Sequence, residues 1–156
     1  MDNACTPSPP VTLVIGYGNT LRGDDGVGPR VAEAIEKMNL SGVVTLICQQ
    51  LSPEHADPIS RAKQVVFVDA AVDAPNEVRL RKLEANESSQ LMAHAADPRT
   101  LLALARDVFG QVPVAWWLTI PAVKLGFSEE LSPEAQHGFS EAVEKIRSIC
   151  CNAPKK

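Results

Sequence analysis

The chain has 156 residues, of which 45% are hydrophobic and 22% charged, as expected for one compact globular domain. Its formal net charge of -4 gives no support to nucleic acid or an anionic membrane as a partner. No apolar run approaches the roughly 18 to 20 residues that span a bilayer, and the first residues do not resemble a signal peptide, so we expect a cytoplasmic protein.

The first third of the chain predicts a strand, a helix and a second strand. Residues 1–10 are rich in proline and are expected to form a flexible tail. Residues 11–17 are apolar and β-branched, as in a strand buried on both faces. Residues 27–38 place apolar side chains at helical spacing, and residues 43–48 form the next apolar strand.

The middle of the chain continues this alternation. Residues 52–62 predict a helix with Ser52 as its N-cap. Pro58 should shorten or kink this helix. Residues 64–72 are a third apolar strand, and residues 77–83 alternate apolar and charged side chains, as in a half-exposed edge strand.

The last third predicts two helices around a fifth strand. Residues 97–110 should form a helix capped at its start by Asp97 and closed by Gly110. Residues 114–120 are the fifth strand, and residues 132–150 form the closing helix.

Strands that alternate with helices indicate the α/β class, with a mostly parallel five-stranded sheet between helices. We predict a single domain over residues 11–150 with a short tail at residues 151–156. The four cysteines lack C-x-x-C spacing and are expected to be free thiols, with Cys48 buried in a strand.

Carboxylates gather where the sheet is expected to bind a ligand. Loops that follow the carboxyl ends of parallel strands meet at one edge. Asp24 and Asp25 follow the first strand, Asp69 lies in the third, and His94 precedes a helix. Two carboxylates and an imidazole suit a borderline divalent metal ion.

Other interpretations of these residues remain open. A dinucleotide-binding loop fits Gly16 and Gly18, but Leu21 occupies its third glycine position and carboxylates follow it. A phosphate-accepting receiver domain would use an acidic pair and Asp69, but six residues from Gly18 to Gly23 separate the pair from its strand.

Structural roles are also possible for the same side chains. Asp25 could cap the helix that begins near Val27, Asp69 could stabilise a turn, and His94 could be an ordinary surface residue. His55 and His137 lie in helical stretches and are expected to be structural.

Residues 16–28 read GYGNTLRGDDGVG and satisfy the pattern G-x-G-N-x-L-x-x-D-[DE]-G-x-G. Together with VVFVDAA and MAHAAD further along, this motif resembles the hydrogenase maturation endopeptidases, and the resemblance runs from about Val11 to Ile149. It implies a single α/β domain with a twisted five-stranded sheet.

The resemblance also implies a site. Asp25, Asp69 and His94 correspond to two carboxylates and a histidine that are thought to recognise nickel and take part in hydrolysis. Five residues of the first motif would support this site: Gly16, Gly18, Asn19, Asp24 and Gly26.

The implied activity is removal of the C-terminal extension of a [NiFe] hydrogenase large-subunit precursor after nickel insertion. The nickel would arrive with the precursor, so the isolated protein is expected to be metal-free. The alternative is a non-catalytic checkpoint that only senses nickel. An acid or base role for Asp24 or Asp69 stays open, and no Ser, Cys or Thr nucleophile stands out beside a base.

Two segments depart from the family pattern. Residues 49–55 read QQLSPEH where many members have a Gly-Gly-Thr turn, and Glu54 there is a candidate for substrate contact. Residues 121–133 are an unusual version of the segment before the last helix and are expected to influence partner choice.

Overall fold

A five-stranded sheet lies at the centre of the computed structural model, which describes residues 12–72, 77–86 and 97–151. Within these residues the strand order is β2-β1-β3-β5-β4, and only β4 runs antiparallel to its neighbour. The strands are β1 Thr12–Tyr17, β2 Val43–Cys48, β3 Gln64–Ala71, β4 Arg79–Leu83 and β5 Val114–Pro121. The predicted α/β fold with a mostly parallel sheet is confirmed.

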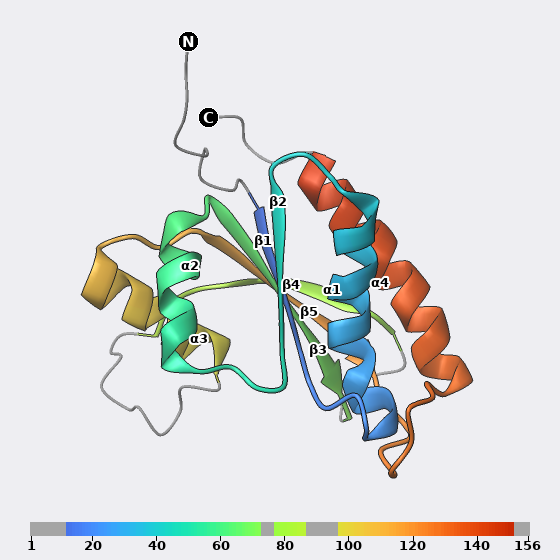
Figure 1. Cartoon of the computed structure of the whole chain (residues 1–156). Helices are drawn as coiled ribbons and strands as arrows, with labels where there is room; N and C mark the ends of the chain where they lie inside the picture. The colour runs from blue at the N-terminus through green and yellow to red at the C-terminus, as the bar shows by residue number, and fades with distance from the viewer. Residues whose placement is uncertain (1–11, 73–76, 87–96, 152–156) are drawn as a thin grey trace.

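Helices cover both faces of the sheet (Figure 1). Helices α1 and α4 lie on one face, while α2 and α3 lie on the other. Their bounds are α1 Val27–Met38, α2 Ala56–Arg61, α3 Pro98–Leu104 and α4 Pro133–Cys151. No helix in the described part of the chain has the length and hydropathy needed to cross a membrane.

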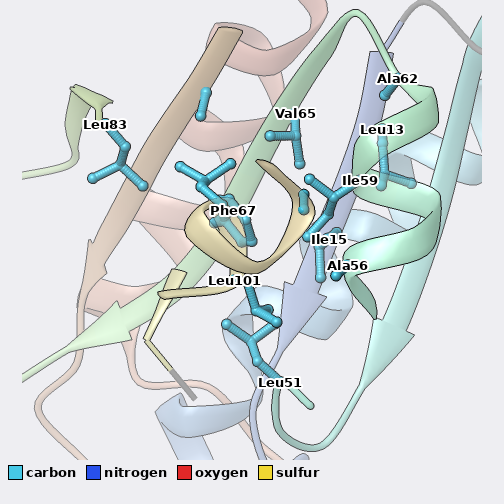
Figure 2. Packing of buried hydrophobic residues seen from close by; sticks show 13 residues of the cluster. Leu13, Ile15, Leu51, Ala56, Ile59, Ala62, Val65, Phe67, Leu83 and Leu101 are labelled. Carbon is cyan, nitrogen blue, oxygen red and sulfur yellow. The ribbon is translucent and has the colours of Figure 1, made fainter. Parts of the chain in front are cut away.

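The central strands are buried on both faces, as their apolar sequences predict. In β1, Leu13 and Ile15 contact the core beneath α2 and α3, whereas Val14 contacts the core beneath α1 and α4. In β3, Phe67 points toward Leu101 of α3, and Figure 2 shows this packing. Because successive side chains of a strand point to opposite faces of the sheet, each central strand contributes to both hydrophobic layers.

Two predicted helices differ in detail from the structure. Residues 52–62 form a 3-10 turn, Pro53–His55, before the short α2, because Ser52 donates its backbone N–H to His55 Nδ1 at 3.0 Å. The helix from Asp97 ends in a π turn, Ala105–Phe109, although Gly110 closes it as predicted. His55 is thus a structural residue.

Strand β4 lies at the edge of the sheet, as predicted, but its apolar side chains do not share one face. Val78 and Leu80 pack on the α1/α4 side, while Leu83 packs on the α2/α3 side. The spacing of three residues between Leu80 and Leu83 places them on opposite faces of a strand. Cys48, Cys150 and Cys151 are free thiols; Cys48 is only half-buried, and Cys5 lies outside the described residues.

Helix α1 starts in direct contact with the sheet because two glycines face each other there. A Cβ added at Gly16 would lie 2.2 Å from the Gly28 carbonyl oxygen. A Cβ added at Gly28 would lie 2.5 Å from the carbonyl oxygen of Val68 and 2.8 Å from that of Tyr17. This close approach fixes where the loop between β1 and α1 can go.

We expect Gly28→Ala to lower the free energy of unfolding by about 2 kcal/mol, since the new methyl group would meet backbone oxygens that cannot move aside. Gly126→Ala is the matched control, because a Cβ there meets nothing within 4 Å. Urea unfolding of both variants checks this. Equal midpoints for the two variants would contradict the role given to the glycine contact.

Candidate active site

The loop between β1 and α1 is closed by hydrogen bonds from Asn19. Its backbone N–H donates to Asp25 Oδ2 at 2.8 Å, and its side-chain Oδ1 accepts the N–H of Leu21 at 2.9 Å. Gly18 has a φ of 146°, and a Cβ there would lie 2.0 Å from the Asp25 carbonyl oxygen. Asn19 thus holds the loop through both its backbone and its side chain.

Asp24 is fully buried and joins this loop to the segment that follows β5. Its carboxylate accepts the backbone N–H groups of Val123 at 2.8 Å, Lys124 at 3.0 Å and Ser132 at 2.7 Å. The Ser132 hydroxyl donates a fourth hydrogen bond at 2.7 Å. Burial alone would raise the pKa of Asp24, but these hydrogen bonds hold the pKa below its usual value.

Asp25 is only partly buried and does not cap α1. Gly26 is the N-cap of that helix, and no side chain hydrogen-bonds to the helix start there. The Asp25 carboxylate instead turns back to the N–H of Asn19. The helix-capping interpretation of Asp25 is therefore wrong, and the interpretation as a loop-supported carboxylate fits.

Asp69 lies near the carboxyl end of β3, where Tyr17 of β1 donates its hydroxyl to Asp69 Oδ2 at 3.1 Å. The pKa of Asp69 is raised to about 6, mainly by burial and to a smaller extent by the nearby charge of Asp25, against the opposing hydrogen bonds from Tyr17 and the Ala70 N–H. The structure thus brings Asp25 and Asp69 close enough to repel each other.

Tyr17 was not among the predicted site residues. Burial raises its pKa well above the usual value, with a further contribution from Asp69, so its hydroxyl remains a donor. The sequence did carry a signal, because Tyr17 is a polar-tipped residue at the end of an apolar strand and lies inside the first motif.

His94, the third predicted ligand, lies outside the described residues. Among the residues that the structure does describe, no three His, Cys, Asp or Glu side chains are grouped to hold a metal ion. Two carboxylates at one sheet edge would need a further donor to bind a transition metal. The set of Asp25, Asp69 and His94 therefore stays a prediction.

Other candidate residues lie elsewhere or carry backbone roles. Glu54 is exposed in the 3-10 turn after β2, and His137 is exposed on α4. Residues 121–133 contact the first-motif loop directly: the N–H of Gly23 donates to Ser128 O at 2.8 Å. The segment that departs from the family pattern is thus part of the same sheet edge as Asp25.

Comparison with known proteins gives a consistent result. No family model matches the chain. A protein of Methanocaldococcus jannaschii, provisionally assigned as a hydrogenase maturation protease, is 28% identical over 92% of this chain and 96% of its own length. The predicted resemblance to the hydrogenase maturation proteases is confirmed.

Solved structures extend the resemblance to three dimensions. The hydrogenase 2 maturation peptidase of a Thaumarchaeota archaeon is 26% identical, with a TM-score of 0.65 over 88% of this chain and 95% of that one. The [NiFe] hydrogenase maturation protease HybD of Thermococcus kodakarensis is 21% identical, with a TM-score of 0.71 over 89% and 98%. The second similarity shows a shared fold.

We expect Asp24→Ala to lower the free energy of unfolding by about 3 kcal/mol, because it leaves four donors without an acceptor: the two buried ones of Ser132 and the partly buried N–H groups of Val123 and Lys124. Asp57→Ala, which removes an exposed pair with Arg61, should cost less than about 1 kcal/mol. Chemical denaturation measures both. A loss at Asp24 no larger than at Asp57 would contradict the supporting role.

The Asp24 contribution should depend on pH. Its pKa is lower in the folded than in the unfolded chain, so the stabilisation is fully present above the unfolded pKa and is lost as pH falls through the folded one. We therefore expect the stability difference between wild type and Asp24→Ala to be constant near neutral pH and to shrink below about pH 4. Unfolding curves between pH 7 and pH 2.5 measure it; a constant difference would argue against an ionised Asp24.

Proposed function

We propose that this chain is an endopeptidase that removes the C-terminal extension of a [NiFe] hydrogenase large-subunit precursor. The observation that carries the proposal is the convergence of Asp25 and Asp69 at the carboxyl edge of the sheet, within the first motif and β3. Full-length similarity to hydrogenase maturation proteases supports the same class of activity. The cytoplasm remains the expected location.

Nickel, in this proposal, belongs to the substrate. The precursor presents it, and Asp25, Asp69 and His94 recognise it. The carboxylate of Asp69 is costly to ionise in the free protein, since burial and Asp25 oppose its charge. An incoming cation would relieve that opposition, so the site favours a metal-loaded substrate over a metal-free one.

The roles of the remaining groups follow from their surroundings. The N–H of Asn19 orients the Asp25 carboxylate, and the hydroxyl of Tyr17 orients that of Asp69. Asp24 is saturated by four hydrogen bonds and is buried, so it has no access to a substrate proton. Asp69 is then the better candidate for a general base, because its raised pKa lies closer to neutrality.

Cleavage of the precursor tests the proposal directly. Nickel-loaded precursor should lose its C-terminal peptide, seen as a mass shift, whereas nickel-free precursor should remain intact. Loaded precursor that binds but is never cut would instead establish a non-catalytic nickel checkpoint. The isolated protein, analysed for metal content, should carry no stoichiometric nickel.

The three predicted residues give a sharper version of the assay. Asp25→Asn, Asp69→Asn and His94→Ala should each reduce cleavage to about one hundredth of the wild-type rate or less. Glu36→Gln and Glu144→Gln are matched controls, because both residues are exposed in the later turns of helices that begin at the carboxyl edge of the sheet, and both variants should cleave normally. Normal cleavage by any one of the three site variants removes that residue from the site.

A further inference from the structure

Three large apolar side chains are exposed beside the first-motif loop. Leu21 is 44% exposed, Val123 is 59% exposed and Phe127 is 89% exposed. Leu21 belongs to the loop after β1, whereas the other two belong to the segment after β5. We call this set the apolar crest. Exposure of a nearly complete phenylalanine side chain is the informative feature, because isolated exposed aliphatic residues are common.

The crest lies on a fixed backbone. The N–H of Ser128 donates to Leu21 O at 2.9 Å, and that of Gly23 donates to Ser128 O at 2.8 Å, which pairs Arg22 with Ser128 as in a parallel sheet. Leu21 and Phe127 each precede this pair by one residue and are therefore neighbours. Figure 1 shows the segment after β5 beside the start of α1.

Val123 is anchored by a separate interaction. Its N–H donates to the buried carboxylate of Asp24, which also holds the N–H groups of Lys124 and Ser132. Both ends of the segment after β5 are thus bound to one carboxylate. The backbone that carries the crest is therefore ordered before any partner binds, so little conformational entropy of this segment is lost on binding.

A groove continues from the crest along the same loop. The groove has a volume of about 340 Å³. Its wall includes Leu21 together with Gly18, Asn19, Ile47 and Cys48. A raised aromatic residue beside a hollow is a shape that suits a folded protein partner. The N–H of Asn19, at this groove, is the group that holds Asp25.

We propose that the apolar crest docks the protein whose peptide bond is cut, with Phe127 inserted into an apolar recess of that protein. This inference rests on the proposed function. A folded substrate that reaches Asp25 must lie over the loop that carries both Asp25 and Leu21, so the crest is continuous with the contact surface that cleavage requires. Phe127 is a docking residue and touches no reacting atom.

Phe127→Ala tests the inference, with Phe109→Ala as the matched control. Phe109 is 45% exposed in the π turn that precedes β5, whereas Phe127 follows the carboxyl end of that strand. Steady-state cleavage of the nickel-loaded precursor by each variant should be compared with wild type. We expect Phe127→Ala to raise KM about tenfold or more with little change in kcat, and Phe109→Ala to change neither.

Direct binding separates this inference from the proposed function. Titration of the loaded precursor into each variant should show a Kd about tenfold or more weaker for Phe127→Ala, with partial recovery in Phe127→Leu. An unchanged KM and Kd in Phe127→Ala, at an unchanged melting temperature, would overturn the inference while cleavage persists. If wild type binds the precursor without cutting it, the proposed function fails, and the same titration still decides the role of Phe127.

Discussion

The carboxylate of Asp24 is the interaction on which the arrangement of the site depends. Strands β1 and β5 are not neighbours, because β3 lies between them in the sheet. Asp24 nevertheless binds the loop after β1 to both ends of the segment after β5, through Val123, Lys124 and Ser132. The two loops are thus held across the carboxyl end of β3, where Asp69 lies.

Asp24 and Asp69 have opposite surroundings. Asp24 is surrounded by donors that stabilise its charge and lower its pKa, so its ionisation supports the fold. Asp69 is desolvated near the charge of Asp25, and its pKa rises to about 6, so its ionisation works against the fold. Charges that a folded protein keeps against a stability cost are expected where a ligand compensates for them. This contrast distinguishes the supporting carboxylate of Asp24 from the carboxylate of Asp69, to which we assign a role in recognition.

Much of the fold could be predicted because it depends on local patterns. Helix α1 and strand β2 have the predicted bounds, since amphipathic spacing and apolar runs are read directly from neighbouring residues. The ends of the other helices were less predictable. Hydrogen bonding by the His55 ring and a π turn after Leu104 decided them, and neither has a clear periodic signal.

The site could be predicted in part, because motif and topology both pointed to Asp25 and Asp69. Sequence reasoning could not decide which aspartate of the pair is buried, since the answer depends on Ser132, which is 108 residues away. Tyr17 was missed for a similar reason, because its role depends on the hydrogen bond from its hydroxyl to Asp69, a residue of another strand. Long-range polar contacts of this kind leave no regular spacing in a sequence.

The same contacts explain how the segment after β5 can depart from the family pattern without disturbing the site. Val123 and Lys124 bind Asp24 through their backbone N–H groups, so their side chains can change while the hydrogen bonds remain. Ser132 alone uses its side chain as well. A loop held by its backbone can therefore carry different outward-facing residues, such as Phe127, at a constant distance from the carboxylates. The proposed docking through Phe127 and the proposed nickel recognition would in this way be physically separable, although both depend on the hydrogen bonds of Asp24.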